Sequence, residues 1–328
     1  MSETPIVAAE ELRVYFPVRR RGGLFRRTEP LKAVDGVTLS VGAGETLGIV
    51  GESGCGKTTL ARALLRLVPH TGGELRWSGI DPRTLSREAL RERRRELQIV
   101  FQDPLAALDP RMTAGEIVAE PLRSFFPRMS RPERQARVAE TLTRVGLAPV
   151  MANRYPHEFS MGQCQRIGIA RAIVAEPRLL VCDEPVSALD VSVQAQIVNL
   201  LTRLQRDFRL AMIFISHNLS VVRQVSGRIL VLHLGHVVEV AERDALFERP
   251  AHPYTRALIS AVPLPDPRRE RSRERAVLRG ELPSPLNPPS GCTFRTRCPR
   301  ATELCAERAP KLEEVAPGHR VACHHWRD

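Results

Sequence analysis

The sequence has little lysine, few cysteines and no long apolar run. Of its 49 basic residues, only Lys32, Lys57 and Lys311 are lysines. The arginines are scattered along the chain, so the net charge of +12 does not mark out a nucleic-acid-binding segment. No apolar run reaches the ~18 residues that a membrane-spanning helix needs. We therefore expect no transmembrane segment.

The cysteines and the first residues indicate a reducing compartment. Seven cysteines are too few to form a disulfide scaffold for 328 residues. The opening stretch MSETPIVAAEEL is acidic and lacks the basic flank and apolar core of a secretory signal. A hydrophobic content of 43% excludes wholesale disorder. These features predict a folded protein of the cytosol.

Strands alternate with helices over most of the chain, which favours an α/β fold with a mainly parallel sheet covered on both faces. Residues 104–159 are interrupted by prolines and contain no good strand, so they predict a helical insertion. The expected strands are 6–16, 37–41, 46–50, 179–182, 211–215 and 228–232. One helix is expected to begin at Lys57, and two others are expected over 83–97 and 191–208.

Two segments differ in composition from this core. Five arginines between 19 and 27 predict an exposed loop that is either simply solvated or in contact with a partner or anionic lipid. Seven prolines between Pro263 and Pro289 predict a linker over 263–290. We thus expect a main domain over 1–262, with a helical subdomain at about 104–160, and a C-terminal extension over 291–328.

A phosphate-binding loop is the clearest motif. Residues 51–58, GESGCGKT, fit G-x-x-x-x-G-K-[ST] and lie between an apolar strand and a helix. Glycines let backbone N–H groups surround phosphates, and the helix presents its positive end to them. Lys57 can reach the terminal phosphates, and Thr58 can hold Mg²⁺. The candidate ATP contacts are Gly51, Glu52, Ser53, Gly54, Cys55, Gly56, Lys57 and Thr58.

A second strand delivers two carboxylates. The apolar run Leu179–Cys182 ends at Asp183 and Glu184. Asp183 can join the Mg²⁺ shell, and Glu184 can act as the general base that activates water for attack on the γ-phosphate. Together with the phosphate-binding loop, this pair predicts a nucleoside triphosphatase.

Further motifs resemble those of ABC-transporter ATPase subunits. Phe159–Gln163 (FSMGQ) resembles their signature motif, Ser187–Asp190 (SALD) their D-loop, Phe101–Asp103 (FQD) their Q-loop and Ile215–His217 (ISH) their switch histidine. Segments 157–172, 182–192, 252–263 and 280–299 resemble oligopeptide and dipeptide importers, most closely the second ATPase subunit. The resemblance covers nearly the whole chain and implies a P-loop NTPase fold with a small cysteine-containing C-terminal extension.

The resemblance implies roles for individual residues. Phe16 would stack on adenine, although its position at the end of a strand also fits a core role. Thr59 would touch the α-phosphate, Gln102 would sense Mg²⁺ and the attacking water, and His217 would bond the γ-phosphate. In this family two ATPase chains enclose two ATP molecules. Ser160, Gly162 and Gln163 would therefore act on the nucleotide of the other chain.

Met161 departs from the family pattern, which has glycine at this position. A side chain here would crowd the γ-phosphate and forbid a positive φ. Our hypothesis is that the site formed with the partner's P-loop hydrolyses ATP slowly, while the site of Lys57 and Glu184 stays competent.

Four thiols in the last 37 residues suggest a metal centre. Cys292, Cys298, Cys305 and Cys323 lack the close pairs of zinc ribbons. Their wider spacing, with Pro299 after Cys298, favours a four-thiolate iron–sulfur cluster, and zinc or unmetallated thiols remain alternatives. The peptide-importer resemblance also implies a 4Fe-4S cluster at these cysteines.

The expected function is ATP hydrolysis coupled to uptake of oligopeptides or dipeptides. The implied partners are a second ATPase subunit in a heterodimer, two transmembrane permease subunits and, indirectly, a solute-binding protein, with this chain on the cytoplasmic face of the membrane. The alternatives are import of another solute such as a nickel chelate, a nucleic-acid-linked ABC ATPase, and a non-catalytic module built on the cysteine tail. We expect no specific nucleic-acid partner.

Overall fold

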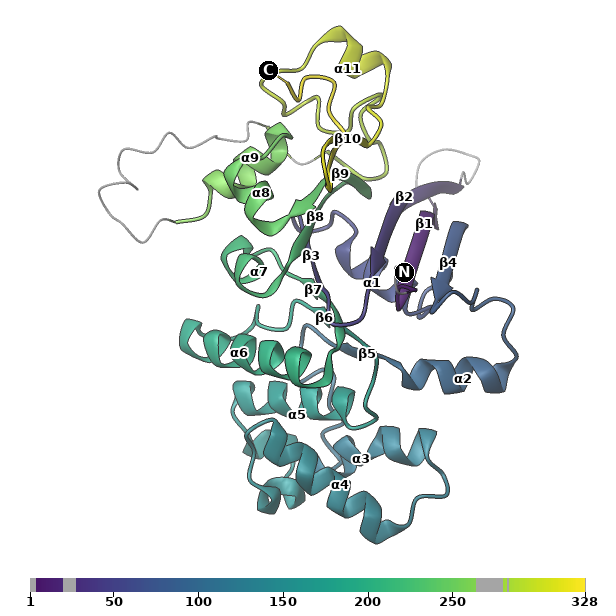
Figure 1. Ribbon diagram of the computed structural model, residues 1–328, viewed down its shortest axis with the longest axis vertical. Coiled ribbons are helices and arrows are strands. Elements are labelled where there is room, and N and C mark those ends of the chain that lie inside the picture. The colour runs from purple at the N-terminus through teal and green to yellow at the C-terminus, as the bar shows by residue number, and fades with distance from the viewer. Residues whose placement is uncertain (1–3, 20–27, 264–279, 282, 328) are drawn as a thin grey trace. The chain divides into compact units, whose positions relative to one another are not determined.

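The computed structural model describes residues 4–19, 28–263, 280–281 and 283–327 (Figure 1). Most of the predicted basic loop and much of the predicted linker lie outside these residues. The chain forms two compact units. The first combines Met1–Ala8, Ser40–Thr46 and Arg76–Ile215, and the second combines Ala9–Leu39, Leu47–Leu75 and Ser216–Asp328. The second unit thus contains both the predicted phosphate-binding loop and the C-terminal extension.

The first unit contains three parallel strands. β6 (Leu179–Asp183) pairs with β5 (Leu97–Val100) on one side and with β7 (Ala211–Ile215) on the other. Every residue of β6 and β7 is buried. Parallel strands buried on both faces read as continuous apolar runs, and this is why the sequence revealed β6 and β7. It missed β5, whose first residue fell in the helix expected over 83–97 and whose two central residues are only half-buried.

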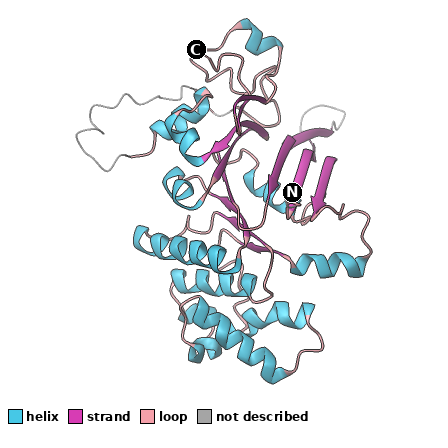
Figure 2. Cartoon of the chain, viewed as in Figure 1, coloured by secondary structure: helices cyan, strands magenta, loops and turns pink. Residues whose placement is uncertain are grey.

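The predicted helical insertion is confirmed within the described residues. Residues 104–159 form helices and turns without a strand (Figure 2). Thr113 and Ser130 each form a capping box with the glutamate three residues later, which fixes where α3 and α4 begin. The helical elements of the unit are α2 (Arg87–Arg95), α3 (Ala114–Phe125), α4 (Arg131–Arg144), η1 (Pro149–Asn153), η2 (Pro156–Glu158), α5 (Met161–Ile173) and α6 (Val191–Phe208).

The second unit has mixed strand directions. β3 (Thr46–Val50) runs parallel to β8 (Arg228–His233), while β8 and β9 (His236–Glu242) form an antiparallel hairpin. The turn of this hairpin has positive φ at Leu234 and Gly235. The mainly parallel sheet that the sequence predicts is therefore only part of the architecture. The helices are α1 (Lys57–Leu64), α7 (Leu219–Val225), α8 (Arg243–Glu248), α9 (Pro253–Ser260) and α11 (Glu303–Glu307).

A three-stranded sheet carries the N-terminal strand. Its order is β2–β1–β4, and most of its residues belong to the second unit. The strands are β1 (Val7–Arg19), β2 (Thr28–Val41) and β4 (Gly72–Trp77). The sequence indicated most of β1 and the end of β2, but it did not indicate β4.

The C-terminal extension continues the core of the second unit. β11 (His319–Val321) pairs antiparallel with β9, and β10 (Glu313–Ala316) pairs with β11. The buried carboxylate of Glu239 lies 2.7 Å from His319 Nε2, which fixes β11 on its neighbour. The extension thus adds two strands next to β9. The sequence missed these strands because they are short and polar.

Candidate functional site

Two positions of the predicted phosphate-binding loop must be glycine, because neighbouring backbone leaves no room for a side chain there. Gly51 has a φ of 156° and Gly56 a φ of 108°. A Cβ at Gly51 would lie 2.2 Å from Leu232 O, and one at Gly56 would lie 2.2 Å from Ala33 O. The loop between β3 and α1 therefore depends on glycine for both conformation and space.

The loop presents donors suited to an anion. Gly56 is the N-cap of α1 and supplies no side-chain cap, and the first turn of this helix contains no acidic residue. Its backbone N–H groups and dipole can therefore serve phosphates. Lys57 is 5% exposed, and its Nζ donates to Gly51 O at 2.8 Å and to Glu52 O at 3.0 Å. The ammonium group lies inside the loop, as phosphate binding requires.

The remaining residues of the loop differ in their exposure to solvent. Ser53 and Gly54 are exposed at its tip, while Cys55 is buried beneath. Burial raises the pKa of the Cys55 thiol, so this side chain is a neutral packing group. Thr58 and Thr59 are half-buried in the first turn of α1.

Asp183, the predicted Mg²⁺ ligand, and Glu184, the predicted general base, lie at the end of β6. Asp183 is buried, and Glu184 follows it with a φ of 47°. Gln102 Nε2 donates to Glu184 Oε2 at 3.0 Å, so the structure joins two residues that are 82 positions apart in the sequence. The N–H of Glu184 donates to Ile215 O at 3.0 Å, which holds the strained backbone in place. The carboxylate is thereby fixed in direction.

The signature segment begins α5. Ser160 is the N-cap, its Oγ accepts from the N–H of Gln163, and Gln163 Oε1 accepts from the N–H of Ser160. A Cβ at Gly162 would lie 2.5 Å from Val193 Cγ1, so the close packing of α5 on α6 requires glycine there. Met161 is the first helical residue and is not among those with positive φ. Our argument that Met161 forbids a positive φ was therefore wrong, and only the steric argument remains.

His217 and Phe16 lie in the second unit with the phosphate-binding loop. The N–H of Ser216 donates to Ile49 O at 3.2 Å, which attaches the segment before His217 to β3. His217 is exposed, and Asn218 next to it caps α7 by accepting from Ser220 and Val221. Phe16 is half-buried in β1. Gln102, Asp183, Glu184 and the signature residues lie in the first unit.

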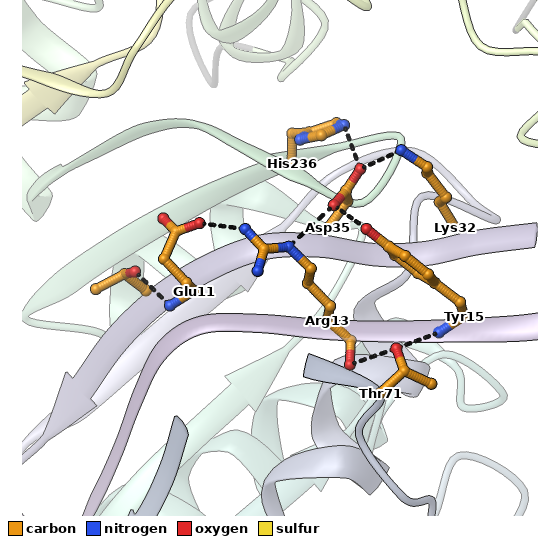
Figure 3. Close-up of polar contacts among 8 residues, drawn as sticks. Glu11, Arg13, Tyr15, Lys32, Asp35, Thr71 and His236 are labelled. Atoms are coloured by element: carbon orange, nitrogen blue, oxygen red, sulfur yellow. Dashed lines mark hydrogen bonds and ion pairs between the residues drawn. The ribbon is translucent and has the colours of Figure 1, made fainter. Parts of the chain in front are cut away.

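A polar cluster fixes the strand that carries Phe16 (Figure 3). Asp35 accepts from Tyr15 Oη at 2.5 Å and from Lys32 Nζ at 3.1 Å, with Arg13 Nε at 3.6 Å and His236 Nε2 at 3.8 Å. Burial would raise the pKa of Asp35, but the bonds from Tyr15 and Lys32 lower it overall. Burial and the Asp35 carboxylate raise the pKa of Tyr15 to about 12. The cluster joins β1, β2 and the start of β9.

Sequence reasoning missed the residues that hold the phosphate-binding loop from outside. The N–H of Glu52 donates to Tyr254 Oη at 2.8 Å, and Arg297 forms an ion pair with the Glu52 carboxylate. Both residues follow Glu52 by more than 200 positions, and no motif spacing connects them with it. The one sequence signal near them is that Tyr254 and Arg297 lie in segments 252–263 and 280–299, which resemble peptide importers.

The four C-terminal cysteines are close enough for the charge of three of them to affect the fourth, Cys292. The N–H of Cys292 donates to Cys305 O at 2.8 Å, and Cys305 is buried. Burial raises the pKa of Cys292 to about 11, and the other three thiols add to this effect. Among the described residues, no three His, Cys, Asp or Glu side chains are placed to share a single metal ion.

Two buried histidines pack the extension onto the rest of the second unit. The rings of His233 and His252 lie 5.4 Å and 5.5 Å from that of Phe294, and Tyr254 lies 5.3 Å from it. His252 Nδ1 accepts from the N–H of Tyr254 at 3.0 Å, which caps α9 and requires the neutral ring. Burial, helped by His233 and Arg256, lowers the pKa of His252 to about 3.

This histidine predicts acid sensitivity. The unfolded chain binds a proton at His252 below its ordinary pKa of about 6.5, whereas the folded chain does not, so stability falls as the pH drops from about 6.5 toward 3. Asparagine can cap the helix without titrating. Between pH 7 and 5.5, we expect His252→Asn to lose about 1 kcal/mol less unfolding free energy than the wild type does. Urea unfolding at both pH values measures this difference.

The exposed His157 supplies the control for this prediction. His157→Asn should keep the pH dependence of the wild type, because this side chain lies outside the buried cluster. Equal losses of unfolding free energy in wild type and His252→Asn would contradict the assignment of a neutral ring at this position.

The geometry defines a P-loop nucleoside triphosphatase, and comparisons with known proteins agree. Residues 34–187 match the ABC transporter family, and residues 238–305 match the oligopeptide/dipeptide transporter C-terminal region. The chain is 55% identical over 314 residues to the oligopeptide transport ATP-binding protein OppF of Salmonella typhimurium, covering 95% of this chain and 94% of that protein. It is 52% identical over 325 residues to AppF of Bacillus subtilis, covering 98% of each.

A solved structure also matches this chain. The dimeric ATP-binding cassette MJ0796, bound to ADP and Pi, has a TM-score of 0.63 at 30% identity and covers 72% of this chain and 98% of its own. The chain therefore belongs to the ATP-binding subunits of ABC transporters, within the group of oligopeptide transport ATP-binding proteins. It is an ATPase with the P-loop fold that the sequence predicted, and Mg²⁺ is expected with its ATP.

Proposed function

We propose that this chain powers the import of oligopeptides or dipeptides from the cytoplasmic face of the cell membrane. The observation that carries the proposal is identity of 50% or more to oligopeptide transport ATP-binding proteins over nearly the full length of both chains. The match to the C-terminal region of oligopeptide/dipeptide transporters adds to it. Within the described part of the chain, no helix is long and apolar enough to cross a bilayer, so the transport path would belong to other subunits.

Uptake by cells tests the proposal. A strain that lacks this chain should lose uptake of a labelled tripeptide, and the wild-type gene should restore it, whereas the Lys57→Ala gene should not. Unchanged peptide uptake in the deletion strain, with loss of uptake of a nickel chelate, would reassign the substrate. Salt-sensitive binding of DNA or RNA, without membrane association, would support the nucleic-acid alternative instead.

Residues of this chain would carry out the hydrolysis. Lys57 and the N-terminal N–H groups of α1 would bind the phosphates, and Thr58 and Asp183 would hold Mg²⁺, which neutralises phosphate charge when bound. Glu184 would take a proton from the attacking water at its carboxylate, with Gln102 Nε2 directing one oxygen. His217 would bond the γ-phosphate, Thr59 the α-phosphate and Phe16 the adenine. Catalysis here is mainly positioning and electrostatics.

A second ATPase subunit would complete the site. The sequence contains one phosphate-binding loop and one signature segment. Ser160 at the start of α5 is exposed, and Val191 beside the D-loop is 82% exposed. The start of α5 and the residue after the D-loop are therefore both accessible to a partner chain. We therefore propose a heterodimer in which Ser160, Gly162 and Gln163 act on the partner's nucleotide.

The transmembrane permease subunits would contact the surface near Gln102. A pocket of about 260 Å³ beside it is lined by Phe101, Glu120, Phe125 and Arg171, among others. Leu105, three residues after Gln102, is 48% exposed. A partly apolar hollow next to the residue that touches Glu184 would let a docked helix of a permease influence catalysis. A solute-binding protein would act through those permeases.

Met161 predicts unequal hydrolysis at the two sites of the heterodimer. Its side chain stands at the N-terminus that would approach the partner's γ-phosphate, where the family has glycine. We expect Met161→Gly to raise single-turnover hydrolysis at the partner-side site by about tenfold, an effect of the size expected for improved approach to the phosphate. Hydrolysis at the site of Lys57 should stay within twofold. An unchanged partner-side rate would refute the hypothesis.

A 4Fe-4S cluster at Cys292, Cys298, Cys305 and Cys323 is our proposal for the extension. Burial raises the pKa of Cys292, Cys298 and Cys323, and the charge of neighbouring thiols in the group adds to it, which is consistent with four thiols that lie close together. Iron and acid-labile sulfide should be found in anaerobically purified protein. A colourless protein with stoichiometric zinc would refute the cluster.

A further inference from the structure

The C-terminal extension reaches the phosphate-binding loop through one buried arginine. Arg297 Nη1 donates to Glu52 Oε2 at 2.6 Å, and Nη2 donates to Glu52 Oε1 at 2.9 Å. This is a bidentate pair, the arrangement in which a guanidinium fixes a carboxylate in direction as well as in place. The Arg297 side chain is 6% exposed and that of Glu52 is 27% exposed. The pair is therefore shielded from solvent far better than a surface ion pair.

Within the described part of the chain, the hydrogen bonds of the Arg297 guanidinium go to Glu52 alone. Its Nε is buried and has no hydrogen-bond partner among the described residues. Burying a guanidinium costs free energy unless an anion compensates for it. The hydrogen bond from Arg297 lowers the pKa of Glu52, so the carboxylate stays charged at neutral pH. Glu52 is thus the group that makes the buried position of Arg297 tolerable.

Glu52 is part of the phosphate-binding loop and touches its lysine. The N–H of Glu52 is bonded to Tyr254 Oη, and its carbonyl accepts from Lys57 Nζ at 3.0 Å. Glu52 therefore places a negative charge on the same short loop that must accept the phosphates of ATP. An uncompensated carboxylate there would repel the nucleotide and would be free to bond the Lys57 ammonium group.

We propose that Arg297 is a positioning residue of the ATP site, which neutralises Glu52 and holds its carboxylate away from Lys57 and the phosphates. Through this pair the C-terminal extension sets the nucleotide affinity of the loop. The inference rests on the ATP-binding function described above. Arg297 itself touches neither nucleotide nor reacting atoms.

Binding of a fluorescent, non-hydrolysable ATP analogue to the full-length chain tests the proposal. We expect Arg297→Ala to raise the Kd by about tenfold, the change that corresponds to ~1.4 kcal/mol. Glu52→Gln should raise the Kd less than Arg297→Ala does, because it removes the negative charge from the loop, although it also leaves Arg297 without its anion. The double variant Glu52→Gln/Arg297→Ala should recover most of the affinity that Arg297→Ala loses.

The matched control is Arg295, two residues away in the same extension. Its guanidinium bonds Ser290 O and Oγ and does not contact the loop, so Arg295→Ala should bind the analogue as the wild type does. Arg297→Lys should lie between wild type and Arg297→Ala, because lysine restores the charge without the bidentate fork.

Two outcomes would overturn the proposal. The first is an unchanged Kd in Arg297→Ala. The second is a double variant that binds as weakly as Arg297→Ala, because this would show that the variant merely disrupts the extension. Failure of the wild-type chain itself to bind the analogue would refute the ATP site, and this result is distinct from both.

Discussion

We expect Glu184→Gln to leave ATP bound and uncleaved. Glutamine keeps the size of the side chain and can still accept the hydrogen bond from Gln102 Nε2, but it cannot take a proton from water. Loss of a general base costs about 10²–10⁴-fold in rate. Single-turnover hydrolysis by the full-length chain with its partner ATPase, and the Kd of ATP measured separately, distinguish loss of chemistry from loss of binding.

Glu176 provides a matched control for Glu184. It is also a glutamate in the left-handed region, with a φ of 52° against 47° for Glu184. Its carboxylate pairs with Arg137 at 2.8 Å on the surface of the same unit. Glu176→Gln should therefore hydrolyse ATP within twofold of wild type. Wild-type turnover in Glu184→Gln would mean that another group is the base.

The second large effect is expected from Lys57→Ala. The Lys57 ammonium group is buried within the loop and bonded to two of its carbonyl groups, so it is already placed for the terminal phosphates. Its removal deletes charge-assisted hydrogen bonds worth about 3 kcal/mol together, which corresponds to roughly a 100-fold rise in the Kd of ATP. Equilibrium binding of the fluorescent analogue to the full-length chain measures this loss.

Lys311, an exposed lysine in the extension, provides the control. Lys311→Ala should bind the analogue within twofold of wild type, because this residue lies outside the loop. Lys57→Ala removes two hydrogen bonds that close the loop, so circular dichroism should confirm an intact fold. Tight binding of ATP by a folded Lys57→Ala chain would contradict our reading of the loop.

Local sequence determined the parts of the fold and site that depend on neighbours along the chain. β3, β7 and α6 have the bounds that the apolar runs and helical periodicity predicted. Gly51 and Gly56 belong to a motif whose spacing encodes its conformation. The helical insertion was predictable because its prolines and capping residues exclude strands and fix helix starts.

Some expectations failed because the sequence signal was weak or misread. β10 and β11 are short and mostly polar in sequence, so they contain no apolar run, and the pairing of β11 with β9 depends on a long-range contact. The positive φ that we expected at position 161 came from the glycine of the family pattern. Ser160 caps the helix and Met161 is its first residue, so Met161 has ordinary helical geometry.

The sequence alone determined the chemistry of this protein: a phosphate-binding loop, a pair of carboxylates after a strand, and a signature segment in family order. Only the tertiary structure decided which side chains meet. It joined Gln102 to Glu184, Arg297 to Glu52 and His319 to Glu239. The physical reason is that motifs encode local backbone geometry, whereas an ion pair across 245 residues forms only when the packing of the unit brings both groups out of water together.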